Sequence, residues 1–324
     1  MRTLQSILKA IDDKLSPEKF SVFLRHQNTA ESTALMIAAE FGCKDAVEEI
    51  LKYPTKTEKE KRINENDDYI SNAFFIACER NNVSVVEYLF YYLGTENSSY
   101  LFSKKKHGKN VLMVACEYGS FEVVEKMLGR NECTGDWINS QNENENEKGM
   151  TALMYACTGK CDNAEKIVEL LLEHEAKPSL GPTGEKDHNS PLLLASYCGS
   201  HKMVDLLLKG PGRNAENDNE KKPAENGNGK KPAENDNGKK PAENDNERKS
   251  AKSYIDQYSG TSTLANNRTP LMVACVAGHY KVAETLINNG ASSWLPLENG
   301  VTTTPTRNRN AFFMALFNGN AKIT

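Results

Sequence analysis

The sequence predicts an all-α solenoid that is built from repeated helix-turn-helix units. Seven ten-residue segments align without gaps, and their starting points lie 39, 38, 41, 39, 79 and 41 residues apart. Apolar residues with helical spacing follow six of these segments. Self-similarity at a nearly fixed period is the signature of a stacked repeat architecture. The segments are TALMIAAEFG from Thr33, NAFFIACERN from Asn72, NVLMVACEYG from Asn110, TALMYACTGK from Thr151, SPLLLASYCG from Ser190, TPLMVACVAG from Thr269 and NAFFMALFNG from Asn310.

Residues 1–30 are predicted to form an N-terminal helical cap. Their apolar residues fall on one face of a first helix, and the sequence Ser16-Pro17-Glu18 is a start signal for a second helix. A repeat array needs such a cap because the apolar face of its first repeat would otherwise be exposed. The expected inward-facing residues are Leu4, Ile7, Leu8, Ile11, Leu15, Phe20, Phe23 and Leu24.

Each ten-residue segment predicts a short helix with a defined start and stop. Its first residue is Thr, Asn or Ser, whose side-chain oxygen can accept a hydrogen bond from the first helical turn. Alanine lies five residues later in every copy, where a small side chain suits close packing against a neighbouring helix. A glycine nine residues after the cap predicts the C-terminal stop in five copies. The alanines are Ala38, Ala77, Ala115, Ala156, Ala195, Ala274 and Ala315, and the glycines are Gly42, Gly119, Gly199, Gly278 and Gly319.

A second helix is predicted after each of the first six segments. Apolar pairs recur there at positions i, i+1, i+4 and i+5, which places them on one helix face. Val85–Val86 with Leu89–Phe90, and Val123–Val124 with Met127–Leu128, are examples. The two helices of each unit therefore form a hairpin with one apolar side.

These units resemble the ankyrin-repeat family. The family pattern is Thr-Pro-Leu-His-x-Ala-Ala-x-x-Gly-His followed by Val-Val-x-x-Leu-Leu-x-x-Gly-Ala, and the copy that begins at Thr269 matches it most fully. The family histidine is replaced by Met, Phe or Leu in every copy. The period of 38–41 residues exceeds the family's period of about 33. The resemblance thus implies an ankyrin-like α-solenoid with long inter-repeat fingers. The matching residues are Thr269, Pro270, Leu271, Ala274, Gly278, His279, Val282, Leu286, Gly290 and Ala291.

The chain is expected to divide into four parts. Residues 1–30 form the cap, 31–210 form repeats one to five, 211–250 form an insertion, and 251–324 form repeats six and seven. The insertion contains tandem nine-mers such as KKPAENDNG with no large apolar residue, so we expect it to be disordered. The seventh repeat is incomplete, which suggests that a longer protein continues or that another surface covers this end.

Composition limits the possible functions and the compartment. The chain has 324 residues, 40 Lys plus Arg, 44 Asp plus Glu and a net charge of −4. Such a chain has no global field that would attract nucleic acid or an anionic membrane. No apolar run approaches the length of about 18 residues that crosses a bilayer, and the N-terminus lacks a signal-peptide core. We therefore expect a cytoplasmic, reducing location in which all eight cysteines are free thiols.

The sequence offers no constellation that would carry chemistry. It contains no glycine-rich phosphate loop and no nucleophile elbow, and its six histidines are scattered. Cys157 and Cys161 form a C-x₃-C pair, but no second pair or nearby histidine completes a zinc site. We therefore expect a protein that is not an enzyme and has no catalytic, cofactor-binding or metal-binding residues.

The candidate partner-binding residues lie seven and eight positions after each cap. In ankyrin-like stacks this end of the first helix faces the concave surface. The residues there differ between copies, and the first three copies carry a glutamate with aromatic residues interleaved or beyond it. Aromatic residues beside charge are typical of interface hot spots. We expect these residues to bind another protein, at a segment of that partner that is basic and partly apolar. They are Glu40, Phe41, Glu79, Arg80, Glu117, Tyr118 and Tyr197.

Two alternatives of other classes remain open at this point. The array could be the recognition arm of a longer enzyme, such as a kinase or a ubiquitin-ligase adaptor. Nucleic-acid binding would rest only on the run Lys104-Lys105-Lys106-His107, which has no interleaved aromatic residues. We expect neither nucleic acid nor a membrane as partner. The oligomeric state is left open.

Overall fold

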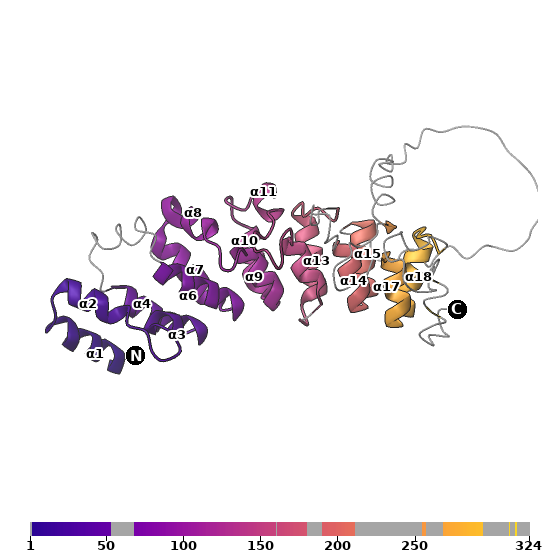
Figure 1. Cartoon of the computed structure of the whole chain (residues 1–324). Coiled ribbons are helices and arrows are strands. Elements are labelled where there is room, and N and C mark those ends of the chain that lie inside the picture. The colour runs from indigo at the N-terminus through magenta and orange to yellow at the C-terminus, as the bar shows by residue number, and fades with distance from the viewer. Residues whose placement is uncertain are drawn as a thin grey trace, which may run out of the picture.

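The computed structural model describes residues 2–52, 68–159, 161–179, 190–210, 255–256, 268–293, 311 and 315. Helices succeed one another along an extended stack from the N-terminal cap to α18 (Figure 1). Outside the helices, the described residues contain one isolated antiparallel bridge, between Lys106 and Lys109. The prediction of an all-α solenoid is therefore confirmed.

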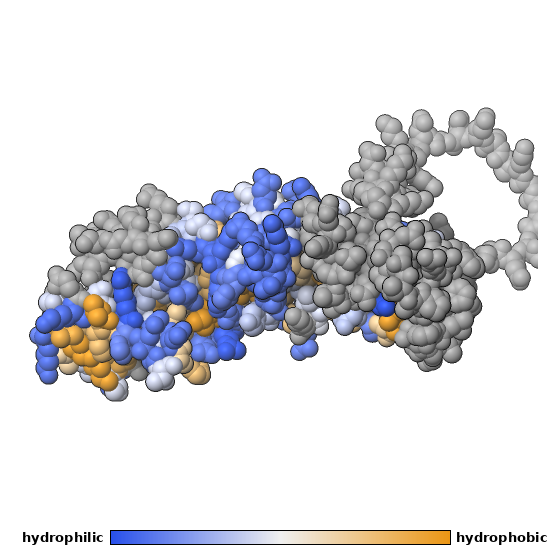
Figure 2. All heavy atoms as spheres, viewed as in Figure 1, coloured by the Kyte–Doolittle hydropathy of each residue, from blue (hydrophilic) through white to orange (hydrophobic). Residues whose placement is uncertain are grey.

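Two helices, α1 (Arg2–Asp12) and α2 (Pro17–Leu24), occupy the N-terminal end of the stack. Leu8 on α1, and Phe20 and Leu24 on α2, are buried in the common apolar core. Ile7 and Phe23, which the sequence placed inward, are about half exposed instead. Figure 2 shows apolar residues gathered on the surface at the end of the molecule that carries the cap.

Six helix pairs follow, and each repeats the same arrangement. The first helices of successive pairs contact one another, and so do the second helices, which gives two parallel layers. Repeats five and six are direct neighbours although their caps are 79 residues apart in sequence. The pairs are α3 (Ala34–Glu40) and α4 (Lys44–Lys52), α6 (Asp68–Glu79) and α7 (Val83–Leu93), α9 (Val111–Tyr118) and α10 (Phe121–Leu128), α12 (Ala152–Cys157) and α13 (Ala164–Glu173), α14 (Pro191–Cys198) and α15 (His201–Lys209), and α17 (Pro270–Ala277) and α18 (Tyr280–Asn288).

The predicted capping residues start five of the six first helices. In each, the side-chain oxygen accepts a hydrogen bond of 2.8 to 3.3 Å from the backbone N–H three residues later. The prediction of a cap at Asn72 is wrong, because α6 begins at Asp68. Tyr69 and Ile70 bury their side chains in the core, so the helix is extended by a turn on its N-terminal side. The five confirmed caps are Thr33, Asn110, Thr151, Ser190 and Thr269.

The small and apolar positions of the repeat pack as the sequence predicted. The alanine five residues after each cap is at most 7% exposed in all seven copies. The residues that replace the family histidine are buried at Phe75, Met113, Met154, Leu193 and Met272. Apolar packing therefore occupies this position of the repeat.

The turn between the two helices of a repeat can form hydrogen bonds to the end of the first helix in the repeat before it. Gly119, Gly199 and Gly278 end their helices in the left-handed conformation, and Asn81 adopts it in the second repeat, with φ of 56°. The residue that follows Asn81, Asn82, donates through Nδ2 to the carbonyl oxygens of residues 39 and 40 at 2.7 and 2.9 Å. These carbonyls belong to the last turn of α3, and the oxygen of residue 39 also accepts from the Gly42 N–H at 3.2 Å.

The long fingers predicted from the repeat period carry helical turns of their own. Helix α8 (Thr95–Ser103) follows repeat two, and the short helix α11 (Gly135–Ile138) follows repeat three. Trp137 of α11 packs edge-to-face on Phe102 of α8, with ring centroids 4.9 Å apart, and its Nε1 donates to the Phe102 carbonyl at 3.2 Å. The predicted insertion 211–250 lies outside the described residues. So does the seventh repeat except for Ala311 and Ala315, which are buried.

Candidate partner-binding surface

The candidate residues all lie at the C-terminal ends of first helices, which form one layer of the stack. Because α3, α6, α9, α12 and α14 contact one another in this order, the residues follow each other along one edge of that layer. We call this set the inner row. It consists of Glu40 and Phe41 at the end of α3, Glu79 and Arg80 at the end of α6, Glu117 and Tyr118 at the end of α9, and Tyr197 near the end of α14.

The three aromatic side chains of the inner row are exposed. Phe41 is 75% exposed, Tyr118 54% and Tyr197 49%. Large apolar groups in water are favourable contact points for a partner, since their burial releases the solvent that covers them. The row therefore presents one such group in the first, third and fifth repeats.

The charged members of the row are already paired within the chain. Arg80 Nη2 lies 2.8 Å from Glu40 Oε1 of the preceding repeat. Glu79 Oε1 lies 2.6 Å from Lys106 Nζ, and Glu117 Oε2 lies 2.8 Å from Lys109 Nζ. A cation of this chain thus lies against each of the three carboxylates, so they do not act as free charges along the row.

Sequence reasoning missed the two lysines that make these pairs. Lys106 and Lys109 exchange two backbone hydrogen bonds of 2.9 and 3.0 Å across the finger turn. His107 and Gly108 between them have φ of 52° and 78°, the combination of a tight hairpin turn. The turn directs both lysines toward the inner row. The sequence did contain a usable signal for this turn. Gly108 lies two residues before the cap Asn110, as Gly149 lies two residues before the cap Thr151 of the next repeat.

The lysine run of this finger is occupied by the chain itself. Lys104 Nζ lies 3.1 Å from Asp68 Oδ1, and Lys105 pairs with Glu143 of the following finger. With Lys106 on Glu79, every lysine of the run has a carboxylate partner. A nucleic-acid phosphate would have to displace these carboxylates before it could bind, which weakens the alternative that rested on this run.

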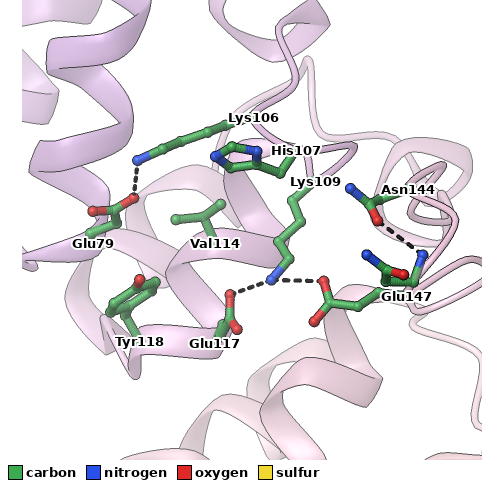
Figure 3. Close-up of a pocket in the computed structure, with 10 residues that line it drawn as sticks. Glu79, Lys106, His107, Lys109, Val114, Glu117, Tyr118, Asn144 and Glu147 are labelled. Carbon is green, nitrogen blue, oxygen red and sulfur yellow. Dashed lines mark hydrogen bonds and ion pairs between the residues drawn. The ribbon is translucent and has the colours of Figure 1, made fainter.

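A pocket of about 530 Å³ opens between this finger and the inner row (Figure 3). The ends of α6 and α9 form one side, and the finger turn and the loop before repeat four form the other. The residues that line the pocket are Glu79, Lys106, His107, Lys109, Val114, Glu117, Tyr118, Asn144, Asn146 and Glu147. The walls of the pocket are therefore mainly polar and charged.

A hydrogen-bonded network fixes the far wall of this pocket. Lys109 Nζ lies 3.0 Å from Glu147 Oε2, which also accepts a hydrogen bond of 2.9 Å from the Tyr155 hydroxyl. Asn142 Nδ2 donates to the same hydroxyl at 2.6 Å. Burial raises the pKa of Tyr155, so the phenol stays protonated and remains a donor. The network joins the finger of repeat three to the loop that leads into repeat four.

Three other expectations concern groups away from the row. All eight cysteines carry free thiols in the structure. Across the described residues, no group of three or more His, Cys, Asp or Glu is arranged to hold a metal ion. No helix in the described part of the chain is both long enough and apolar enough to cross a membrane.

Stacked helix pairs with projecting fingers define a helical-repeat protein of the kind that serves as an interaction module. The chain belongs to the ankyrin-repeat family: the model for ankyrin repeats in three copies matches residues 9–100, 35–136 and 112–221, and the model for one ankyrin repeat matches 266–295. Among solved structures, the ankyrin repeat domain of Bcl-3, described as a unique member of the IkappaB protein family, is similar with a TM-score of 0.51 and 19% identity. That match covers 88% of this chain and 94% of the Bcl-3 chain, and at this identity it shows the fold alone. A search of curated proteins found no match.

Ankyrin repeats generally mediate protein–protein interaction and are typically not enzymes. The chain is therefore built from a class of repeat that generally serves in protein–protein interaction.

Proposed function

We propose that the inner row binds an extended segment of another protein, and that the array acts as a scaffold without chemistry of its own. The observation that supports this proposal is the row of exposed aromatic residues Phe41, Tyr118 and Tyr197, seven or eight residues after the cap in three repeats. By contrast, the large apolar residues two and three positions after each cap are mostly buried in the stack.

The aromatic residues would supply most of the affinity. Each can bury a large area against a partner at little cost in conformational entropy, because its backbone is already held in a packed helix end. The charged residues Glu40, Glu79, Arg80 and Glu117 would supply selectivity at the rim. Their internal ion pairs lower the net field of the row, so long-range steering of a basic partner is weaker than three free carboxylates would give.

The length of the row sets the size of the partner segment. Neighbouring packed helices lie roughly 8–10 Å apart, so the four steps from repeat one to repeat five span about 32–40 Å. An extended chain covers about 3.3 Å per residue, which corresponds to a segment of about 10 to 12 residues. The partner segment is therefore expected to be extended, partly apolar and partly basic.

Selection from a random peptide library tests the proposal. Peptides of about 16 residues, displayed on phage, would be selected on the full chain and then measured against the triple variant Phe41→Ala, Tyr118→Ala, Tyr197→Ala. The matched control is Tyr91→Ala, because Tyr91 is 81% exposed on the second-layer helix α7. Selected peptides should lose at least about tenfold in affinity on the triple variant and keep it on the control.

Two results would count against the inner row. Peptides that bind the triple variant as tightly as the parent chain would place the interaction elsewhere. Peptides that lose affinity equally on Tyr91→Ala would indicate a general effect of removing exposed tyrosines. Circular dichroism of both variants checks that the helical fold is kept.

A further inference from the structure

Two carboxylates in the pocket of Figure 3 each accept a lysine hydrogen bond through only one of their two oxygens. Glu79 bonds Lys106 through Oε1, and Glu117 bonds Lys109 through Oε2. Within the described residues, Glu79 Oε2 and Glu117 Oε1 accept no hydrogen bond. The two side chains are only 17% and 21% exposed, so these oxygens are partly shielded from water. A hydrogen-bond donor that reaches them is attracted more strongly than it would be on an open surface.

The charge balance of the pocket favours a cation. Three carboxylates line it, from Glu79, Glu117 and Glu147, against the two ammonium groups of Lys106 and Lys109. An excess of one negative charge is therefore left over when His107 is neutral. A cationic ligand would complete the balance without breaking any ion pair that is present.

The position of Tyr118 favours a guanidinium over an ammonium as the cation in this pocket. Its ring lies beside both carboxylates in the pocket and is half exposed (Figure 3), so its face is available to a cation. Glu79 and Glu117 hold the same position on the neighbouring helices α6 and α9, which places their backbones roughly 8–10 Å apart. A guanidinium is planar, carries donors along both edges and stacks on aromatic rings, whereas an ammonium is a compact point charge.

We propose that this pocket receives the side chain of an arginine in the partner segment. The guanidinium lies between Glu79 and Glu117 and over the ring of Tyr118. The inference rests on the proposed function, because it assigns one residue of the segment that the inner row binds. It also gives a physical basis for the partly basic character proposed for the partner segment.

An anionic side chain fits the same pocket poorly. A phosphate or carboxylate would have to separate Lys106 from Glu79, and Lys109 from Glu117 and Glu147. Each displaced carboxylate would stay in the pocket and repel the newcomer. Arginine binding leaves all three pairs in place.

Fluorine NMR of the full chain labelled with 3-fluorotyrosine tests the proposal directly. The resonance of Tyr118 is assigned as the one that Tyr118→Phe removes. The probe is the blocked tripeptide acetyl-Ala-Arg-Ala-amide, and its matched control contains citrulline, which has nearly the shape of arginine but no charge. The arginine peptide should move the Tyr118 resonance with a dissociation constant on the order of 1 mM, as expected for one side chain.

The variants separate the carboxylates from general effects of charge. Glu79→Gln with Glu117→Gln should weaken the arginine peptide by about tenfold or more, because charge-assisted hydrogen bonds become neutral ones. Glu143→Gln is the control, since Glu143 pairs with Lys105 in the same finger region but does not line the pocket. It should leave the titration unchanged. The lysine tripeptide should bind more weakly than the arginine tripeptide.

Three outcomes would overturn the arginine assignment. They are no movement of the Tyr118 resonance, equal movement with citrulline, and a stronger response to a phosphoserine tripeptide. The proposed function fails in a different way, through selected peptides that do not depend on Phe41, Tyr118 and Tyr197. Selected peptides that depend on these aromatics but contain no preferred arginine would refute the arginine pocket and leave the inner row standing.

Discussion

Lys109 Nζ lies 3.0 Å from Glu147 Oε2, so the finger of repeat three is bonded to the loop that leads into repeat four. Lys109 also lies 2.8 Å from Glu117 Oε2 and 4.6 Å from the centre of the Tyr155 ring. Its side chain is only 13% exposed. One ammonium group thus connects a first helix, a finger and a loop, and it defines one wall of the candidate pocket.

Lys109→Met should lower the free energy of unfolding by about 1–3 kcal/mol, because two partly buried carboxylates lose their cation. Urea unfolding followed by circular dichroism measures this change. Lys105→Met is the matched control, since Lys105 and its partner Glu143 are both exposed, and such pairs are worth about 0–1 kcal/mol. Equal losses for the two variants would contradict the central role given to Lys109.

Gly108→Ala should destabilise the fold more than Gly290→Ala does. Both glycines have positive φ, 78° and 91°, and a left-handed backbone costs an alanine on the order of 1 kcal/mol. A Cβ at Gly108 would also collide with Asn142 Oδ1 and the backbone of Asn144, whereas a Cβ at Gly290 would meet nothing within 4 Å. The extra loss for Gly108→Ala should exceed about 1 kcal/mol. Thermal unfolding compares the two, and an equal loss would mean that the fingers are not in tight contact.

Ala115→Leu should overpack the middle of the array and cost on the order of 1–3 kcal/mol. Ala115 is fully buried on α9, which packs between α6 and α12. Ala34→Leu is the control, because Ala34 is exposed at the start of α3. Its effect should stay within about 0.5 kcal/mol. Chemical unfolding of the two variants makes the comparison, and a neutral Ala115→Leu would show that this helix contact is looser than the structure has it.

Stability should decline above about pH 9, with Cys133 contributing to the decline. Burial raises the pKa of this thiol from its ordinary value of 9.0 to about 12. The folded state therefore keeps the proton where the unfolded state releases it, and the contribution is complete below pH 9 and is lost as pH rises toward 12. Cys133→Ala should reduce the loss of unfolding free energy between pH 7 and pH 10. Cys43→Ala, at an exposed position, is the control variant. An unchanged loss in Cys133→Ala would contradict the prediction.

The sequence predicted the features of the fold that are local and repeated. Caps such as Asn110, buried alanines such as Ala115 and left-handed stops such as Gly119 depend on a few neighbouring residues, so each copy supports the others. Asn72 was misplaced because the local capping preference is weaker than the burial of Tyr69 and Ile70 ahead of it. Tertiary packing decided that helix start.

The candidate site was predicted less completely than the fold. Its first-helix members could be placed by register, and Phe41, Tyr118 and Tyr197 do lie exposed along one edge. The partners of its carboxylates could not, because the positions of Lys106 and Lys109 depend on the left-handed turn at His107 and Gly108. Charge pairs that join a finger to a helix end are set by three-dimensional geometry, and counts of charge along the chain do not reveal them.

The joints between repeats have a consequence for how such a chain changes in evolution. Asn82 bonds the last turn of α3 from the next repeat, and His279 Nε2 lies 3.1 Å from the carbonyl oxygen of Tyr197, again one repeat back. The first contact joins residues 43 and 42 positions apart, and the second joins residues 82 positions apart. Because each unit brings the donor that completes its predecessor, the connecting segment can lengthen or shorten while the joint stays the same. Gene duplication can therefore add a unit, and a loop can expand, without a compensating mutation in the stack.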